Sequence, residues 1–541
     1  MRRDKFMNRK LLILLMFGTL FSGCASRSFR FADAPPVWDL QDRHPIPLPE
    51  TTKYIRADYY FSVLVRRPAV SAFNFVPGLP AQDVNAVDQV PKSSWFNPRL
   101  GFREISPQEM VSGPAQIGPP KPPVRVVRAK HRGRNPGFVI ADSRDRLYLV
   151  KFDPPNFPGV ETTTAFIVNR LFWAFGYNVP EDYTFYFNSA EVPIDSTADI
   201  TEEEVQLVLG SVAPPQDGLY RATASLLIDG IYLGPIDDKG TRDDDPNDRI
   251  PHQDRRVMRA LKVFGAFTNQ TDIRIDNSLD VYEETDGKGF VRHYLLDFGE
   301  SLGAHGTERG RLWDGFAHVF SFREMFGNIA TLGLRVNKWE HIGYTPWPSV
   351  GTFEADLFDP LKWKEAYPFE PIRKARPDDC YWAAKIVAEL TREQLSALVN
   401  AANYPEPEAA DYVLETLLKR RQKIIDAHFG TVSPVEFAKL DGDTLHLLDL
   451  GKVFGTGFAE SRYRIRQLSD SGKPIGSDFW VEESGNQHIT VPVNPAEIQK
   501  ANGYLRVLVQ VWRDGKAAPR WAEFHLRSRS SREILLAGVV H

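Results

Sequence analysis

The clearest pattern along the chain is an alternation of hydrophobic and polar residues that begins at Val124. Residues 124–130 (VRVVRAK) alternate with the period of a half-buried strand. Residues 138–154 contain two further strand patterns, separated by a short polar turn. Between these stretches the sequence HRGRNPGF includes Gly133 and Gly137, which predict a turn. We therefore expect three short strands joined by turns.

Helical spacing follows this region. Residues 161–175 place apolar side chains at helical intervals before Gly176, and residues 254–267 (DRRVMRALKVFGAF) do the same. Between these two segments, residues 219–235 (LYRATASLLIDGIYLGP) predict one or two strands.

Residues 376–428 are predicted to be mostly helical. Thr391 and Gln394 form a capping-box pattern ahead of one apolar periodic run. Pro407 is expected to begin a further helix that ends at Gly430.

The pattern changes to strands after residue 430. Segments such as RYRIRQL, HITVPV, YLRVLVQVW and RWAEFHL alternate with period two, and residues 513–515 (RDG) mark a turn. We interpret residues 431–541 as a separate, small β-sandwich-like domain.

Length and charge narrow the possible functions. A chain of 541 residues exceeds one compact domain, so two folded units with extensions are expected. A net charge of −4 and a pI near 6.3 indicate no nucleic-acid partner.

The first residues have the pattern of a targeting segment. A basic start (MRRDKFMNRK) precedes the short apolar run LLILLMFGTLF and then Ser22-Gly23-Cys24. These residues resemble a bacterial lipobox, which implies a signal peptide over 1–23, cleavage before Cys24 and lipidation of its thiol. Phe21 stands where that pattern prefers Leu. An ordinary signal peptide with an incidental cysteine is the alternative.

The lipobox resemblance also implies a location. Ala25, rather than Asp, after the cysteine favours the outer membrane by the enterobacterial sorting pattern, so the protein is expected in the cell envelope, facing the periplasm or the surface. The other cysteine, Cys380, is predicted to be a buried structural thiol.

Two segments connect this start to the folded region. Residues 24–50 are Pro-rich and are expected to form an extended tether. Residues 51–123 are interpreted as an N-terminal extension and linker, with strand-like pieces such as YYFSVLV (59–65) and a Pro/Gly-rich connector at 113–123.

Candidate chemistry lies in two nearby stretches. TNQTDIRIDNSLDVY (268–282) places Asp272 five residues before Asn277, and HYLLDFGESLG (293–303) contains Asp297-Phe298-Gly299. Together with a strand that ends in Lys151 and a helix after it, this order resembles the protein-kinase-like fold over residues 124–430. It is most similar to atypical kinases such as the HipA-type toxin kinases and the spore-coat CotH kinases.

The resemblance implies an α+β architecture and a set of roles. It implies a bilobal domain with a β-rich N-lobe and an α-rich C-lobe, followed by the β-sandwich-like domain. Asp272 would accept the proton of the attacking hydroxyl group. Asn277 and Asp297 would bind Mg²⁺ or Mn²⁺. Gln270 stands where the family has a histidine.

Nucleotide binding is assigned on the same basis. Lys151 would hold the phosphates of ATP and Glu161 would pair with that lysine, although an acid at a helix start is also favoured by the helix dipole. Gly133 and Gly137 would form the lid over the phosphates, because short glycine turns offer backbone N–H groups to phosphate. The spacing suits a reaction that needs phosphates, metal and acceptor held in line.

Residues 240–256 (GTRDDDPNDRIPHQDRR) form a second acidic cluster. It could bind substrate or a second metal beside the active site, but a solvated, internally paired loop is favoured. His252 is expected to be a hydrogen-bonded loop residue rather than a metal ligand.

Three functions remain open from the sequence. The first is a membrane-anchored kinase-like enzyme that transfers a phosphoryl or nucleotidyl group to an unknown protein, lipid, sugar or small-molecule acceptor. The second is a kinase-like binding or scaffold lipoprotein without catalysis. The third is a structural envelope protein whose C-terminal domain binds glycan or protein. No G-x-S-x-G, HExxH, CxxC or Walker motif supports other chemistry.

Overall fold

The computed structural model describes most of the chain after the N-terminal segment. The described residues are 31, 36–52, 54–67, 78–131, 133–306, 308–320, 327, 329–332, 334, 336–455, 460–483, 487–530 and 533–541. The signal-peptide and Cys24 predictions therefore lie outside them. None of the helices in these ranges has both the length and the hydropathy that crossing a bilayer requires.

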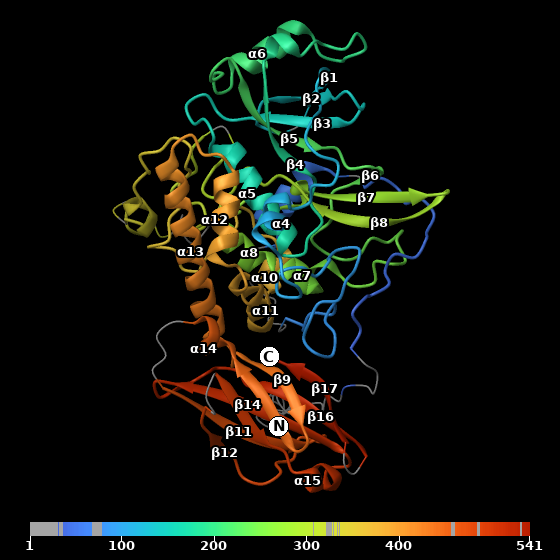
Figure 1. Cartoon of the computed structure of the whole chain (residues 1–541), viewed down its shortest axis with the longest axis vertical. Helices are drawn as coiled ribbons and strands as arrows, with labels where there is room; N and C mark the ends of the chain where they lie inside the picture. The colour runs from blue at the N-terminus through green and yellow to red at the C-terminus, as the bar shows by residue number, and fades with distance from the viewer. Residues whose placement is uncertain are drawn as a thin grey trace, which may run out of the picture. The chain divides into compact units, whose positions relative to one another are not determined.

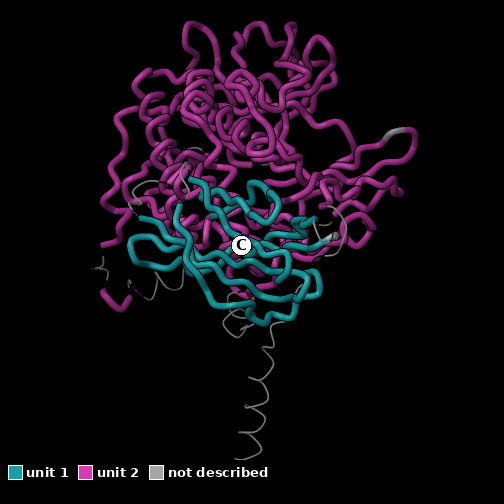
Figure 2. The backbone as a smooth tube through the Cα atoms, turned by 60° about the horizontal axis from the view of Figure 1, so that its bottom comes forward, with its two compact units in different colours: residues 1–35, 435–449, 459–541 teal, residues 36–434, 450–458 magenta. Residues whose placement is uncertain are grey.

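The chain divides into two compact units (Figure 2). Unit 2 comprises residues 36–434 and 450–458, and unit 1 comprises residues 1–35, 435–449 and 459–541. The structure as a whole is mixed α and β, with several antiparallel sheets.

A five-stranded antiparallel sheet forms one end of unit 2 (Figure 1). Its spatial order is β1-β2-β3-β5-β4. The strands are β1 (Arg125–Ala129), β2 (Gly137–Ala141), β3 (Leu147–Phe152), β4 (Asp182–Phe187) and β5 (Tyr220–Leu226). Large apolar residues such as Phe138, Phe152 and Phe185 are buried on one face with helix α6 (Glu202–Gly210). The three strands expected around the glycine turn are confirmed.

Helix α5 (Val160–Ala174) follows β3 and is buried along most of its length. Its start is fixed by Asp153, whose Oδ1 accepts hydrogen bonds from the backbone N–H groups of Glu161 and Thr162, each at 2.9 Å. A carboxylate at this position satisfies donors that the first helical turn leaves unpaired.

A second antiparallel sheet, in the order β6-β7-β8, carries the candidate catalytic loop. Its strands are β6 (Ile231–Gly234), β7 (Ser278–Thr285) and β8 (Lys288–Leu295). Helices α7 (Arg256–Arg259) and α8 (Leu261–Thr268) precede the loop, which includes a 3₁₀ turn at Ile275–Asn277. The 219–235 segment thus forms two strands, β5 and β6, in different sheets.

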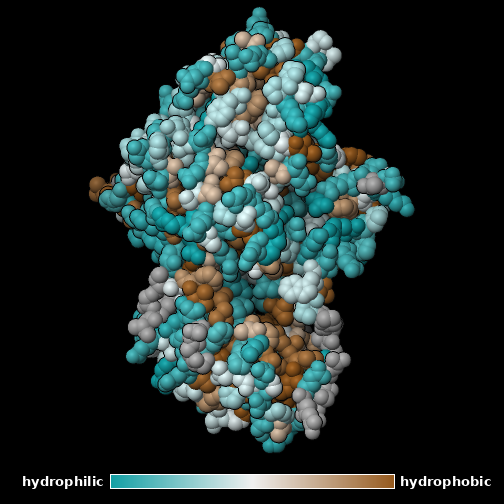
Figure 3. Space-filling model, in the orientation of Figure 1, coloured by the Kyte–Doolittle hydropathy of each residue, from teal (hydrophilic) through white to brown (hydrophobic). Residues whose placement is uncertain are grey.

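Helices from residue 370 onward form a further group in unit 2, which lies below the five-stranded sheet in the view of Figure 1. They are α10 (Glu370–Lys374), α11 (Pro377–Ala388), α12 (Arg392–Ala401), α13 (Pro407–Phe429) and α14 (Leu450–Phe454). The capping box at Thr391 and Gln394 is confirmed, as is the helix that runs from Pro407 to just before Gly430. Hydrophilic residues cover much of the face of this unit seen in Figure 3.

The N-terminal extension packs into unit 2. Residues 36–50 are not a free tether, because Ile46 N–H bonds to the Gly289 carbonyl at 2.8 Å and Ser94 Oγ bonds to Asp42 at 2.8 Å. Helix α4 (Pro107–Ser112) contacts α12. The strand prediction for YYFSVLV is wrong, because residues 56–67 are helical, with α2 (Arg56–Phe61) continuing into a π-helical turn at Ser62–Arg66.

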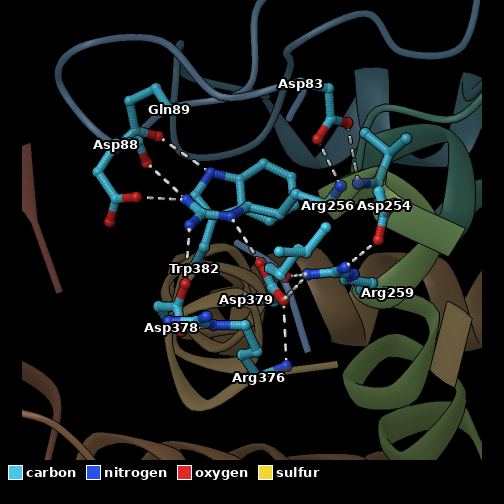
Figure 4. Close-up of polar contacts among 12 residues, drawn as sticks. Asp83, Asp88, Gln89, Asp254, Arg256, Arg259, Arg376, Asp378, Asp379 and Trp382 are labelled. Carbon is cyan, nitrogen blue, oxygen red and sulfur yellow. Dashed lines mark hydrogen bonds and ion pairs between the residues drawn. The ribbon is translucent and has the colours of Figure 1, made fainter. Parts of the chain in front are cut away.

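Buried ion pairs hold part of this extension against the helices (Figure 4). Arg256 pairs with Asp88 at 2.6 Å and with Asp379 of α11 at 3.1 Å. Asp83 accepts a hydrogen bond from the backbone N–H of Arg256 at 2.5 Å. Arg259 pairs with the same Asp379 at 3.2 Å. Charges buried this deeply are retained only when each has a partner.

Unit 1 is formed by two antiparallel sheets around one apolar core. One sheet has the order β13-β10-β9, and the other has the order β12-β11-β14-β16-β17 with β15 paired to β14. The bounds are β9 (Val435–Asp441), β10 (Thr444–Asp449), β11 (Ser461–Ser469), β12 (Phe479–Val481), β13 (His488–Pro492), β14 (Tyr504–Arg513), β15 (Lys516–Ala517), β16 (Ala522–Ser530) and β17 (Glu533–Val540). A short helix, α15 (Pro495–Lys500), precedes β14. The four strand segments expected after residue 430 are all present.

Candidate functional site

Lys151 and Asp297 form the centre of the site. Lys151 lies near the end of β3 and pairs across the sheet with Gly137, while Asp297 follows β8. Their Nζ and Oδ1 atoms are 2.7 Å apart. Burial disfavours both charges, but their mutual attraction outweighs it, raising the pKa of Lys151 and lowering the pKa of Asp297.

Asp297 has an uncommon backbone conformation, with φ of 60°. Asp tolerates the left-handed region better than most residues, but such positions are frequent at functional sites. Gln270 supports it, because its Nε2 donates to the Asp297 carbonyl at 3.2 Å and its Oε1 accepts from Ser301 at 2.6 Å. Gln270 therefore connects the candidate catalytic loop to the Asp-Phe-Gly segment.

The loop between α8 and β7 holds Asp272 and Asn277 together. Asn277 Nδ2 donates to the Asp272 carbonyl at 2.8 Å and to its Oδ2 at 2.7 Å. Arg274 also contacts that carboxylate, at 3.0 Å. Since the amide nitrogen of Asn277 is used in this way, Oδ1 is the side-chain atom that would be left to bind a metal ion.

The electrostatics of Asp272 differ from those of Asp297. Burial, with a smaller effect from the Glu300 charge, raises the pKa of Asp272 to about 8, against the opposing effects of Arg274 and Asn277. A carboxyl group in this state can hold a proton near neutral pH. That property suits proton transfer to or from a hydroxyl group.

Glu161 is buried in the first turn of α5 and faces the site. The Asn135 amide donates to its Oε1, and a Cβ on Gly299 would lie 2.6 Å from the same oxygen. Gly299 therefore allows a close approach that another residue would block. Burial raises the pKa of Glu161 well above its usual range, although Lys151 opposes this. Among the described residues, Lys151 forms its ion pair with Asp297 and none with Glu161.

The two glycines of the expected lid have different surroundings. Gly133 has φ of 84° and lines the cavity described below. Gly137 begins β2, where a Cβ would lie 2.1 Å from the Val150 carbonyl oxygen. Lys130 closes the turn by donating to the Asn135 carbonyl at 2.6 Å.

A cavity of about 440 Å³ brings together Lys151, Asp272, Asp297 and Gly133, whereas Asn277, Glu161 and Gly137 are not among its lining residues. The other residues that line the cavity are Arg56, Tyr60, Lys130, Arg134, Asn135, Thr271, Arg274, Glu300, His305, Arg311, Val319, Ala366 and Tyr367. Six lysine or arginine residues thus face three carboxylates. The excess of positive charge favours a polyanionic ligand such as a nucleotide phosphate.

The residues fit a magnesium ion that is bound partly by phosphate. Asp297 and Asn277 offer hard oxygen ligands, and Mg²⁺ in nucleotide sites often takes only one or two side chains from the protein. In the described part of the chain, no group of three or more His, Cys, Asp or Glu side chains is arranged to hold a metal.

Several residues of the cavity were not identified from the sequence. Arg274 stands two positions after Asp272, and that spacing within one loop was the available signal. Tyr60 lies in α2 and is not part of any recognisable motif. Its hydroxyl nevertheless accepts a hydrogen bond from Arg274 at 3.1 Å. Arg56 of the same helix pairs with Asp276 of the loop at 3.2 Å.

The other acidic cluster is paired, but it is more buried than expected. Asp248 contacts Arg255 at 2.6 Å and His252 at 2.7 Å, and all three are buried. His252 is thus a hydrogen-bonded loop residue, as expected. Cys380 is buried and free, and burial raises its pKa to about 12, which is consistent with a structural thiol.

Comparisons with known proteins give little further information. No family model matches the chain, and no curated protein matches it. Among solved structures, the Helicobacter pylori proinflammatory kinase CtkA is similar with a TM-score of 0.29 and 13% sequence identity, over 56% of this chain and 96% of that chain. The similarity is weak.

Proposed function

We propose that this protein is an exported, membrane-anchored enzyme that transfers a phosphoryl or nucleotidyl group from ATP, with Mg²⁺ or Mn²⁺, to a hydroxyl acceptor. The observation that carries the proposal is the 2.7 Å contact between Lys151 and Asp297 in a cationic cavity that also receives Asp272. A lipid on Cys24 would supply the membrane attachment.

Each polar group has a distinct task in this proposal. Asp297 and Asn277 would hold the metal, and the bound metal would neutralise phosphate charge. Lys151 would then exchange its contact with Asp297 for one with phosphate oxygens. Lys130 and Arg134, which line the same cavity, would add positive charge beside the glycine turn.

Asp272 would orient the acceptor hydroxyl group and take its proton. In phosphoryl transfer, the new bond joins the acceptor oxygen to the γ-phosphorus, the bond to the bridging oxygen breaks, and ADP leaves. Arg274 contacts Oδ2 of Asp272, so it would stabilise the ionised form of this carboxyl group before the proton arrives.

The test uses ATP labelled at either the γ or the α phosphorus. Transfer of the γ label means phosphoryl transfer, and transfer of the α label means nucleotidyl transfer. Asp272→Ala should abolish transfer but keep the thermal shift caused by Mg-ATP, whereas Asp297→Ala should lose both. Asp243→Ala, which removes an exposed carboxylate elsewhere, is the matched control and should behave as the wild type.

A nucleotide-binding protein without catalysis is the second candidate. It is favoured because, among the described residues, Lys151 forms no ion pair with Glu161, the partner that the kinase-like resemblance implies for it. A thermal shift with Mg-ATP but no transfer of either label would support it. The absence of both signals would contradict both candidates.

A further inference from the structure

The larger sheet of unit 1 has one face that is not used by its core. In β11, Tyr463 and Ile465 are fully buried in the core, so the alternate residues point to the opposite, outer face. The side chains on this outer face include arginines and tryptophans. We call them the tryptophan–arginine face, which comprises Arg462, Arg464, Arg466, Trp480, Trp512 and Trp521.

These residues form one contiguous surface. Trp512 of β14 stands opposite Arg462, and Trp480 of β12 stands opposite Arg464. The Arg462 guanidinium lies 4.7 Å from the Trp480 ring centre, and the two tryptophan rings are 5.5 Å apart. Trp480 is 43% exposed, which is high for a tryptophan outside a binding surface.

The charge of the tryptophan–arginine face is positive. Arg466 lies 4.9 Å from the Trp521 ring centre. Asp478 pairs with both Arg464, at 2.6 Å, and Arg466, at 2.9 Å. Arg462 has no carboxylate partner among the described residues. Three guanidinium groups therefore share one contacting carboxylate.

Phe31 attaches the N-terminal segment to the same outer face. Its N–H donates to the Tyr504 hydroxyl at 3.0 Å, and its ring meets the His525 ring at 4.8 Å. Tyr504 and His525 alternate with the buried core residues of β14 and β16. Gly538 makes room for the ring, since a Cβ there would lie 2.2 Å from it.

This attachment limits how far unit 1 can lie from a lipid on Cys24. Six residues lie between Cys24 and Phe31, so the seven Cα-to-Cα steps that join them reach at most about 25 Å when fully extended. The outer face itself extends about 27 Å from Tyr504 to Trp512, at roughly 3.4 Å per residue. A lipidated Cys24 would therefore keep this face close to the bilayer surface.

We propose that the tryptophan–arginine face docks on the anionic headgroup surface of the membrane that holds Cys24. Arginine pairs with lipid phosphate, and tryptophan is favoured at the membrane–water interface. The inference rests on the proposed lipidation of Cys24 and not on nucleotide chemistry, so the two proposals can fail separately.

The test measures vesicle binding without the lipid anchor. The chain from position 24 onward, with Cys24→Ser, is sedimented with large vesicles of phosphatidylethanolamine and phosphatidylglycerol, and with vesicles of phosphatidylcholine alone. We expect binding to the anionic vesicles that weakens as salt is added. Arg462→Gln with Arg464→Gln should weaken it by about fivefold to 25-fold, at roughly fivefold per charge.

A matched variant removes two charges elsewhere in the same unit. Lys439→Gln with Lys500→Gln changes side chains that are 63% and 72% exposed, and it should bind anionic vesicles as the wild type does. Trp480→Ala provides a second variant of the face. Thermal unfolding verifies that each variant is folded.

Three results would overturn the proposal. They are no binding to anionic vesicles, equal loss in the arginine and lysine variants, and equal binding to phosphatidylcholine vesicles. Capture by insoluble peptidoglycan with no vesicle binding would instead assign the face to a glycan. Intact phosphoryl transfer alongside any of these results would leave the enzymatic proposal in place.

Discussion

Replacing Asp272 by Asn distinguishes a functional carboxyl group from a structural one, because the two interpretations predict opposite changes in stability. Asn keeps the shape of the side chain but removes its charge. Burial, with Glu300, raises the pKa of Asp272 from 3.8 to about 8, so the folded protein keeps a proton that the unfolded chain releases. The stability that this proton contributes is fully present below pH 4 and is lost as the pH rises through about 8.

The expected change in the free energy of unfolding follows from the difference between the folded and unfolded pKa values of Asp272. Between pH 5 and pH 8 the wild type would lose at most about 4 kcal/mol through this group, at roughly 1.4 kcal/mol per pKa unit. Structural relaxation and water entry lower the cost of a buried charge, so about half of this loss is expected. The free energy of unfolding of Asp272→Asn, relative to the wild type, should therefore rise by about 2 kcal/mol from pH 5 to pH 8.

The measurement is urea unfolding at both pH values, with a chelator present so that no metal contributes. Asp243→Asn is the control, because its carboxylate is exposed and should give the same difference at both pH values. Asp272 also pairs with Arg274 at 3.0 Å, so a purely structural role predicts that Asn destabilises the fold, and more at pH 8. That outcome would refute the functional interpretation.

Three other substitutions test separate contacts. Gly299→Ala places a methyl group against Glu161, so it should lower the free energy of unfolding by about 1–3 kcal/mol and abolish the Mg-ATP thermal shift. Gly210→Ala, with open space around it, should cause neither the destabilisation nor the loss of the thermal shift. Tyr60→Phe should lower acceptor turnover less than tenfold while the Mg-ATP thermal shift persists, because the substitution removes the hydroxyl contacts with Arg274 and Arg56 and leaves the carboxylates of the cavity in place. Asp379→Asn leaves two buried arginines without full partners and should lower the free energy of unfolding by about 3–5 kcal/mol in a urea titration.

Local patterns were sufficient to predict the strands and helices that carry the site. The alternation around the glycine turn placed Lys151 near the end of a strand, and the helical spacing after it placed Glu161 in a first turn. These assignments succeeded because each depends on periodicity within about fifteen residues. The same holds for the capping box of α12 and for the strands of unit 1.

Long-range charge pairing was not accessible from the sequence. Asp88 and Arg256, which form a buried ion pair, are 168 positions apart, and no spacing rule connects them. The stretch 59–65 is rich in aromatic and β-branched residues, which favour strands, yet it is helical because Tyr59 and Val63 are buried on one side of it. Tertiary burial overrides propensity in such short segments.

The contacts of α2 make the N-terminal extension part of the cavity wall. Arg56 and Tyr60 reach the catalytic loop, and Tyr60 also lies 5.0 Å from the ring of Tyr367, so one wall of the cavity is made by a segment more than two hundred positions from Asp272. An acceptor that approaches Asp272 would meet this aromatic and cationic wall. The extension is then part of the candidate site, and under the proposed function substitutions in α2 should change acceptor selectivity.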